Sequence, residues 1–98
     1  MKVFVFEYIT SGALCDEQLP PSLAREGENM FLAIVNDLAQ LTDIDLLLLR
    51  DHRLDDLNSF DLHANYHCQT IHSANEFEPY YTATLERADA VFIIAPET

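Results

Sequence analysis

Basic side chains are scarce in this sequence. Lysine and arginine together number 5, against 17 aspartates and glutamates, and the formal net charge is -12. Proteins that bind nucleic-acid backbones need clustered lysine and arginine, so this composition argues against that class of protein. It also disfavours binding to an anionic membrane surface, and it favours a soluble chain. The simplest interpretation of the excess negative charge is an acidic surface that maintains solubility.

Long apolar runs and cysteine motifs are also missing. No stretch approaches the ~20 residues of a membrane span, and the N-terminus lacks the apolar core and cleavage site of a signal peptide. The two cysteines, Cys15 and Cys68, fit no CxxC or zinc pattern. We therefore expect a cytoplasmic protein with free thiols; a disulfide between these distant positions is the less favoured alternative.

Glycine occurs only twice, at Gly12 and Gly27. Neither lies in a GxGxxG or GxxxxGK[ST] motif, so a dinucleotide fingerprint or a P-loop phosphate site is unsupported. Gly27 falls within a predicted helix, where glycine is unfavourable by up to ~1 kcal/mol. We infer that a group approaches the helix backbone closely there, or that the helix packs tightly on the first strand.

The sequence does contain apolar runs that alternate with amphipathic segments. Strands are expected at residues 2–8, 45–50, 67–72 and 90–95, and helices at residues 22–41 and 75–88. The first, second and fourth strands are apolar enough to be buried on both faces, whereas the third is short and alternating, as in an edge strand. The pattern predicts one α/β domain over residues 1–98, a three-layer Rossmann-like fold with helices on both faces. Its mostly parallel sheet is expected in the order 3-2-1-4.

The first helix has specific expected features. Ser22 follows Pro20 and Pro21 as an N-cap, with Glu26 near the capping-box position. A further short helix is expected around residues 53–60, and Pro79 is expected in about the first turn of the last helix. The core stripe of the first helix is predicted at Leu23, Met30, Ile34, Leu38 and Leu41, widened by Phe31, Ala33 and Val35.

A functional site is expected at the carboxyl ends of the strands, where ligands bind in doubly wound folds. The loop at residues 9–21 exceeds the usual two to six residues, which favours a functional loop. The N-terminus of the helix that follows suits a carboxylate or phosphate. Arg25 could hold a carboxylate, or could be a surface arginine paired with Glu28 or Asp16. The residues that meet at this rim are Glu7, Tyr8, Ser11, Gly12, Arg25, Glu26, Gly27, Pro96 and Glu97.

Four histidines, His52, His63, His67 and His72, lie within 21 residues. His63 and His67 have the i, i+4 spacing of a helical metal pair, but the stretch is not convincingly helical and HExxH is absent. Solvated histidines are therefore the default interpretation, and no metal ligand is predicted. A Ser/His/Asp or Cys/His arrangement stays open, although no nucleophile motif is present.

Three stretches resemble a known family. They are the segments FEYITSG at residues 6–12, LPPSLAREGENM at residues 19–30 and ADAVFIIAPET at residues 88–98. Together they resemble the N-terminal domain of ATP-grasp ligases, and most closely the tyramine–glutamate ligase-like branch. The loop has less glycine than that family would lead one to expect. The resemblance covers all 98 residues in layout.

The resemblance implies the pre-ATP-grasp domain of an ATP-dependent carboxylate–amine ligase. In that family, ATP and Mg²⁺ lie mainly between two later lobes, a substrate carboxylate becomes an acyl phosphate, and an amine displaces the phosphate. The implied partners are small-molecule carboxylate and amine substrates and the ATP-grasp lobes of the same chain; a homodimer is left open. We expect a fragment of a longer enzyme that is inactive alone and does not bind ATP tightly. The implied substrate contacts are Glu7, Ser11, Gly12, Arg25, Glu26 and Glu97.

Two alternatives belong to other functional classes. The first is a stand-alone flavodoxin-like binding or regulatory domain. A receiver domain is disfavoured, because the acidic pair after the first strand is missing and the only lysine is Lys2. The second is a structural subunit that docks through the third strand or through the opposite sheet edge. Only the ligase hypothesis requires further protein after Thr98.

Overall fold

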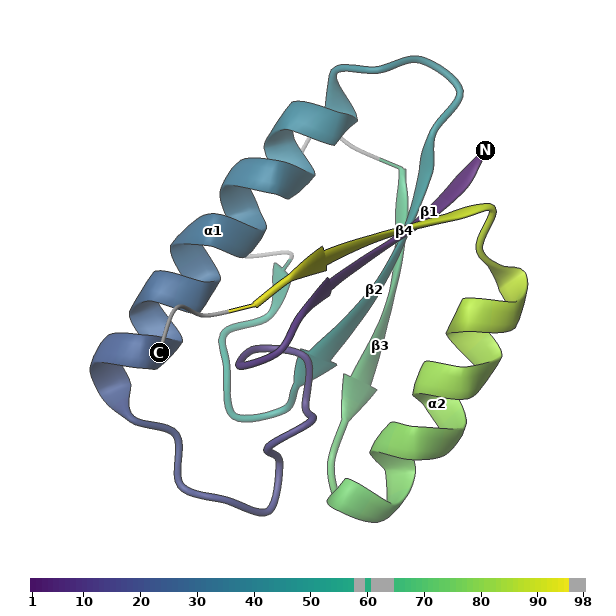
Figure 1. Cartoon of the computed structure of the whole chain (residues 1–98). Coiled ribbons are helices and arrows are strands. Elements are labelled where there is room, and N and C mark those ends of the chain that lie inside the picture. Colours follow the sequence, from purple (N-terminus) through teal and green to yellow (C-terminus); the bar gives the residue numbers. More distant parts are fainter. Residues whose placement is uncertain (58–59, 61–64, 96–98) are drawn as a thin grey trace.

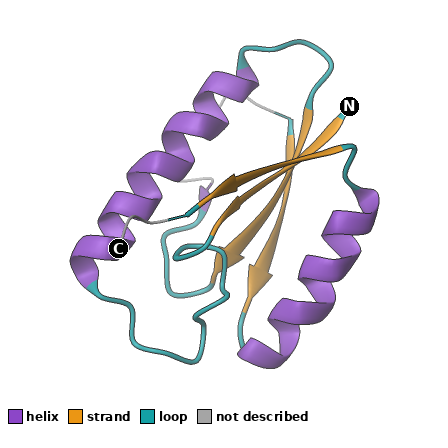
Figure 2. Cartoon of the chain, viewed as in Figure 1, coloured by secondary structure: helices purple, strands orange, loops and turns teal. Residues whose placement is uncertain are grey.

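The chain folds into a four-stranded parallel sheet with one long helix on each face (Figures 1 and 2). The computed structural model describes residues 1–57, 60 and 65–95. The sheet has the order β3-β2-β1-β4, which confirms the predicted topology. The elements are β1 Lys2–Glu7, α1 Pro21–Ala39, β2 Asp45–Asp51, β3 Tyr66–Ile71, α2 Ala74–Arg87 and β4 Ala90–Ile94.

The central strand β1 separates two apolar clusters. Alternate residues of a strand point to opposite faces. Val3 and Val5 accordingly face α1, where they pack with the buried Phe31 and Val35. On the opposite face, Phe4 and Phe6 meet α2; the ring centroids of Phe6 and Tyr81 are 5.2 Å apart. These two layers hold the carboxyl ends of β1 and β2 at one rim of the sheet.

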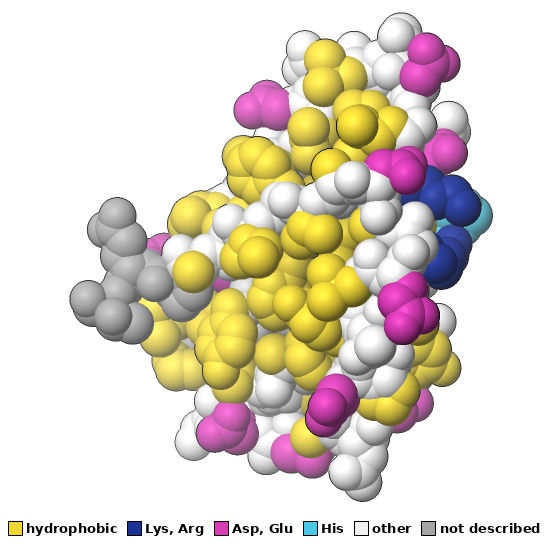
Figure 3. Space-filling model, turned by 45° about the vertical axis from the view of Figure 1, so that its right-hand side comes forward, with side chains coloured by type: hydrophobic (Ala, Val, Ile, Leu, Met, Phe, Trp, Pro, Cys, Tyr) yellow, Lys and Arg dark blue, Asp and Glu magenta, His cyan; other side chains and the backbone are white. Residues whose placement is uncertain are grey.

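Strand β4 departs from the prediction in its burial. It pairs with β1 in parallel, as expected, with Val5 opposite Phe92 and Glu7 opposite Ile94. However, Val91, Phe92 and Ile93 are exposed, and Ile93 is 63% accessible. The prediction of burial on both faces was wrong because β4 is an edge strand, and the two helices do not cover its outer residues. Figure 3 shows hydrophobic side chains gathered over the middle of one face, with acidic side chains around them.

Helix α1 begins one residue earlier than predicted and presents a different stripe. Pro20 is the N-cap and Pro21 is the first helical residue, so Ser22 is not the cap. Proline suits this position because its φ angle is already helical and its missing N–H would be unpaired there in any case. The buried residues are Gly27, Phe31 and Val35. Met30, at 45% accessible, was wrongly placed in the core, as were Ala33 and Leu41, which are also exposed.

The other predicted segments differ in smaller ways. Helix α2 lies within one residue of its predicted bounds, and Pro79 lies inside it, beyond the first turn. On this helix Leu85 is exposed, whereas Thr84 is buried. In the short helix expected at residues 53–60, Arg53 to Asp56 are not helical, and residues 58–59 lie outside the described part. No helix in the described residues is long and apolar enough to cross a membrane.

Candidate functional site

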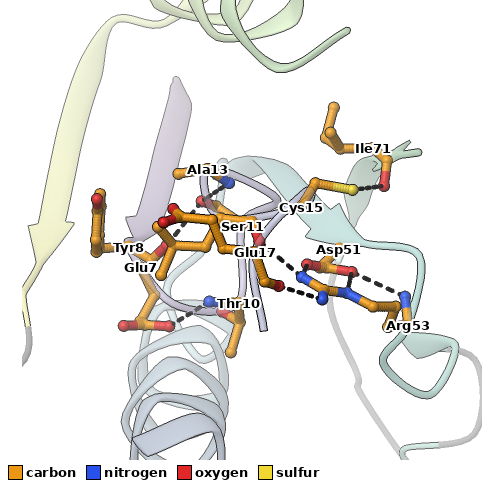
Figure 4. A network of polar contacts seen from close by, with 11 residues as sticks. Glu7, Tyr8, Thr10, Ser11, Ala13, Cys15, Glu17, Asp51, Arg53 and Ile71 are labelled. Carbon is orange, nitrogen blue, oxygen red and sulfur yellow. Dashed lines mark hydrogen bonds and ion pairs between the residues drawn. The ribbon is translucent and has the colours of Figure 1, made fainter. Parts of the chain in front are cut away.

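The carboxyl end of β1 is organised by the buried side chain of Glu7, which is 1% accessible. Its two carboxylate oxygens accept hydrogen bonds from the backbone N–H groups of Ile9, at 3.1 Å, and Thr10, at 2.7 Å. Glu7 is therefore not a solvated residue at the end of the strand. Glu7 shapes the start of the loop from within the protein, as the close view in Figure 4 shows for its bond to Thr10.

Gly27 allows this carboxylate to lie against α1. A Cβ atom built on Gly27 would lie 2.6 Å from Oε1 of Glu7, far inside van der Waals contact. The prediction of a close approach to the helix backbone at Gly27 is confirmed, and the approaching group is Glu7. Glycine is unfavourable in a helix, but it is needed here because the Glu7 carboxylate occupies the space that a side chain at position 27 would fill.

Ser11 and Gly12 continue the loop through a tight turn. The Ser11 hydroxyl donates to the carbonyl of Tyr8, at 3.3 Å, and accepts from the N–H of Ala13, at 3.2 Å. Gly12 has a φ angle of +97°, and a Cβ there would lie 2.5 Å from Cβ of Ile71. Both the backbone conformation and the contact with the residue at the end of β3 require glycine.

The remaining predicted site residues lie apart from this buried group. Arg25 and Glu26 are exposed on α1, whereas Glu97 and Pro96 lie outside the described residues. The structure therefore brings Glu7, Ser11 and Gly12 together and leaves Arg25 and Glu26 on the nearby helix surface. Substrate contact by any of these residues stays a prediction.

Glu28, which was one possible partner of Arg25, instead pairs with Arg50 from β2. The guanidinium of Arg50 donates two hydrogen bonds to the Glu28 carboxylate, at 2.7 and 2.8 Å, and a third to the carbonyl of Asp55, at 2.7 Å. The Arg50 side chain is 4% accessible, and its Cζ lies 5.7 Å from the centre of the Phe60 ring. This pair ties α1 to the end of β2, beside a polar cavity of about 330 Å³.

Asp51 and Arg53 form a second charged pair at the end of β2. Arg53 donates to Asp51 from Nε, at 3.0 Å, and from its second terminal nitrogen, at 2.7 Å. Burial alone would raise the pKa of Asp51, but the hydrogen bonds and charge of Arg53 outweigh burial and hold that pKa below its ordinary value. Arg53 also donates to the carbonyls of Leu14 and Glu17, so it fastens the loop after β1 to β2 (Figure 4).

Cys15, His52, His72 and Glu76 also lie at the carboxyl ends of the strands. The Cys15 thiol donates to the carbonyl of Ile71, at 3.5 Å, and burial together with Asp51 raises its pKa. His52 is exposed and stacks on His72, with ring centroids 5.5 Å apart. Nδ1 of His72 lies 3.5 Å from Glu76. Cys15 and Cys68 are both free, which confirms the prediction of free thiols.

This second group was not predicted from the sequence. Asp51 is the last residue of the buried strand β2, His52 follows it, and Cys15 lies in the loop after β1. Their shared position at the carboxyl rim could have indicated the group. Arg50 and Arg53 were missed because nothing in a single sequence identifies their partners. The helical metal pair weighed for His63 and His67 does not arise, since His67 lies in β3; His63 lies outside the described residues.

The loop after β1 does not fit a nucleotide phosphate. In phosphate-binding loops, successive backbone N–H groups point at the anion. Here the N–H groups of Ile9 and Thr10 are taken by Glu7, and that of Ala13 by the Ser11 hydroxyl. These three N–H groups already bond to side chains of the loop and are therefore not free to bind a phosphate.

Comparison with known proteins gave one family match. The family model described as the pre ATP-grasp 3 domain matches residues 44–98, more than half of the chain. The matched segment includes β2, β3, α2 and β4. No curated protein and no solved structure matches the sequence.

Proposed function

Because this chain belongs to the pre-ATP-grasp 3 domain family, we propose that it is the N-terminal, substrate-side domain of an ATP-dependent carboxylate–amine ligase. The family match points to a role in ATP-grasp ligases. The proposal adds the reaction: activation of a carboxylate as an acyl phosphate, followed by attack of an amine to give an amide. The narrower resemblance to the tyramine–glutamate ligase-like branch stays part of this proposal.

The observation that carries the proposal is the combination of the family match with the exposed apolar strand β4. Val91, Phe92 and Ile93 are exposed on an edge strand, where natural proteins usually place charges or proline. We propose that the ATP-grasp lobes of the same enzyme cover this edge.

ATP and Mg²⁺ belong to those later lobes in this proposal. The first βα loop is filled by the Glu7 carboxylate, so the described residues supply no phosphate cradle there. What the domain offers toward substrate is the exposed start of α1, with Arg25 and Glu26. Arg25 suits a carboxylate of the substrate, because a guanidinium can bind both of its oxygens. Ser11 and Gly12 fix the neighbouring loop. Glu97, which lies outside the described residues, is also proposed to contact substrate.

The test compares the complete protein with the 98-residue chain. The complete protein, incubated with ATP, Mg²⁺ and a panel of carboxylates and amines, is expected to form ADP and phosphate only when a matching pair is present. Hydroxylamine in place of the amine should trap the acyl phosphate as a hydroxamate. The 98-residue chain should give no turnover. Turnover by this chain alone, or a natural reading frame that stops at Thr98, would overturn the proposal.

A further inference from the structure

A mixed group of metal-ligating side chains lies at the carboxyl rim, away from the Glu7 loop. The thiol of Cys15, a carboxylate oxygen of Asp51 and a ring nitrogen of His52 all lie within 4.8 Å of one another. They come from the loop after β1 and from the end of β2. Cys15 and Asp51 are buried and His52 is exposed, so the group opens to solvent on one side.

The surrounding contacts hold two of these ligands in place. Arg53 binds Asp51 and also the carbonyls of Leu14 and Glu17, on either side of Cys15 in the chain. The thiol is therefore held beside the carboxylate by a residue that is not itself a ligand. Figure 4 shows Cys15 between this arginine network and Ile71.

A second histidine, His72, lies next to His52. The His72 ring stacks on His52 at 5.5 Å, with 15° between the ring planes. Its Nδ1 faces Glu76 at 3.5 Å, and Glu76 also accepts the backbone N–H of His72. His72 is not one of the three grouped ligands, but its stacked ring supports the position of the His52 ring.

We propose that Cys15, Asp51 and His52 form a Zn²⁺ site whose fourth position is open to solvent. One thiolate, one imidazole and one carboxylate, with water in the fourth position, make a donor set that zinc accepts in tetrahedral geometry. Zinc–ligand bonds of about 2.0–2.3 Å place neighbouring donors roughly 3.3–3.8 Å apart. The 4.8 Å group must therefore contract by about 1 Å, and the exposed side chain of His52 is free to make that movement.

The charges around the site favour a divalent cation. Asp51, Asp16 and Glu76 all act on Cys15 with negative charge, against the single positive charge of Arg53. Oδ2 of Asp51 accepts one bond from Arg53, which leaves a lone pair for the metal. Without metal, burial keeps the pKa of Cys15 raised, so zinc binding must release the thiol proton. A raised thiol pKa also disfavours the competing role of Cys15 as a nucleophile.

The direct test is titration of the metal-free chain with Co²⁺ alone, then with Zn²⁺ alone. Co²⁺ coordinated by a thiolate gives a strong sulfur-to-metal charge-transfer absorption, and tetrahedral geometry gives intense visible bands. We expect saturable binding of one Co²⁺ per chain with both signals, displaced by Zn²⁺. Zn²⁺ should also raise the melting temperature of the chain.

The chain offers matched controls for both key residues. Cys15→Ser should abolish the charge-transfer absorption, whereas Cys68→Ser, at an exposed cysteine on β3, should retain it. His52→Ala should weaken Zn²⁺ binding by at least about tenfold, and His67→Ala should leave it unchanged. Circular dichroism checks the fold of each variant. If Cys15→Ser does not fold, the exposed pair His52 and His67 decides the question.

Two results would overturn the site. The first is Co²⁺ binding without a thiolate band in the wild-type chain. The second is an equal loss of affinity in His52→Ala and His67→Ala, which would mean adventitious binding by surface histidines. The test is independent of the ligase proposal, because it needs no turnover and every protein ligand lies in this chain.

Discussion

The two edge strands of the sheet have opposite surfaces. On β3, the exposed residues are His67, Cys68, Gln69 and Thr70, whereas on β4 they are Val91, Phe92 and Ile93. Polar side chains let an edge strand face water without recruiting another strand, and apolar ones do not. The difference fits our proposal that further protein covers β4 and leaves β3 as an outer edge.

The two halves of the sheet are also secured by different interactions. The end of β2, next to β3, is held by the ion pairs Arg50–Glu28 and Arg53–Asp51. On the β4 side, β1 meets α1 through the contact of Glu7 with Gly27 and through apolar packing. We therefore expect the stability of the β2 side to depend mainly on ion pairs and that of the β4 side to depend mainly on packing.

The largest effect is expected from Arg50→Met. It leaves the Glu28 carboxylate, 19% accessible, without its partner and removes the bond to the Asp55 carbonyl. Losing one member of a buried pair costs about 3 kcal/mol or more of unfolding free energy, and partial exposure of Glu28 places this case near that lower limit. Urea unfolding measures the change. Arg25→Met, which removes an exposed arginine of α1, is the control and should stay within about 0.5 kcal/mol; equal losses in both variants would contradict the account.

A smaller loss is expected from Gly27→Ala on the other half. The new methyl group would overlap the Glu7 carboxylate and push α1 outward, which costs about 1–3 kcal/mol. The better helix propensity of alanine offsets up to about 1 kcal/mol of this. Asn29→Ala, at an exposed position of the same helix, has the propensity gain without the clash and should be neutral or stabilising. A Gly27→Ala protein as stable as Asn29→Ala in thermal unfolding would show that Glu7 does not need this glycine.

The pH dependence of stability should reveal the Asp51–Arg53 pair. Because the folded pKa of Asp51 lies below its ordinary value of 3.8, the pair stabilises the fold fully above that pH. The stabilisation is lost as the pH falls through the lowered folded pKa. The difference in unfolding free energy between wild type and Asp51→Asn should therefore be constant near neutral pH and shrink below pH 3.8. A difference that grows on acidification would contradict this sign.

The smallest effect on stability, and the sharpest contrast, is expected from a lysine placed on each edge. Ile93→Lys on β4 and Gln69→Lys on β3 should each change stability by no more than about 0.5 kcal/mol, because both positions are exposed. Ile93→Lys should reduce binding of a hydrophobic dye and reduce self-association, while Gln69→Lys should alter neither. Equal responses of the two variants would remove the distinction between the edges.

The strand order and the helix positions could be predicted from the sequence because each element carries its own apolar period. The burial of β4 could not, since Ala-Val-Phe-Ile-Ile-Ala has the composition of an inner strand whether or not a neighbour is present. The buried residues of α1 were mispredicted for a similar reason. Met30 and Leu41 are as apolar as Phe31, and only the position of the sheet decides which of them is buried.

At the site, a close approach of some group to Gly27 could be predicted from the sequence. That this group is the Glu7 carboxylate could not. Glu7 reads as a strand terminus because a carboxylate is usually solvated; its burial depends on two backbone N–H groups that only the folded loop supplies. The Cys15, Asp51 and His52 group was missed for the same reason. Its members are separated in sequence and meet only because β1 and β2 are parallel neighbours.

Hydrogen–deuterium exchange, compared between the 98-residue chain and the complete protein, tests the central claim most directly. The claim is that β4 is an inner strand covered by the ATP-grasp lobes and that β3 is a free edge. The account predicts that residues 90–94 exchange rapidly in the short chain and become strongly protected in the complete protein, while residues 66–71 exchange alike in both. Unchanged exchange at residues 90–94, or new protection confined to residues 66–71, would contradict it.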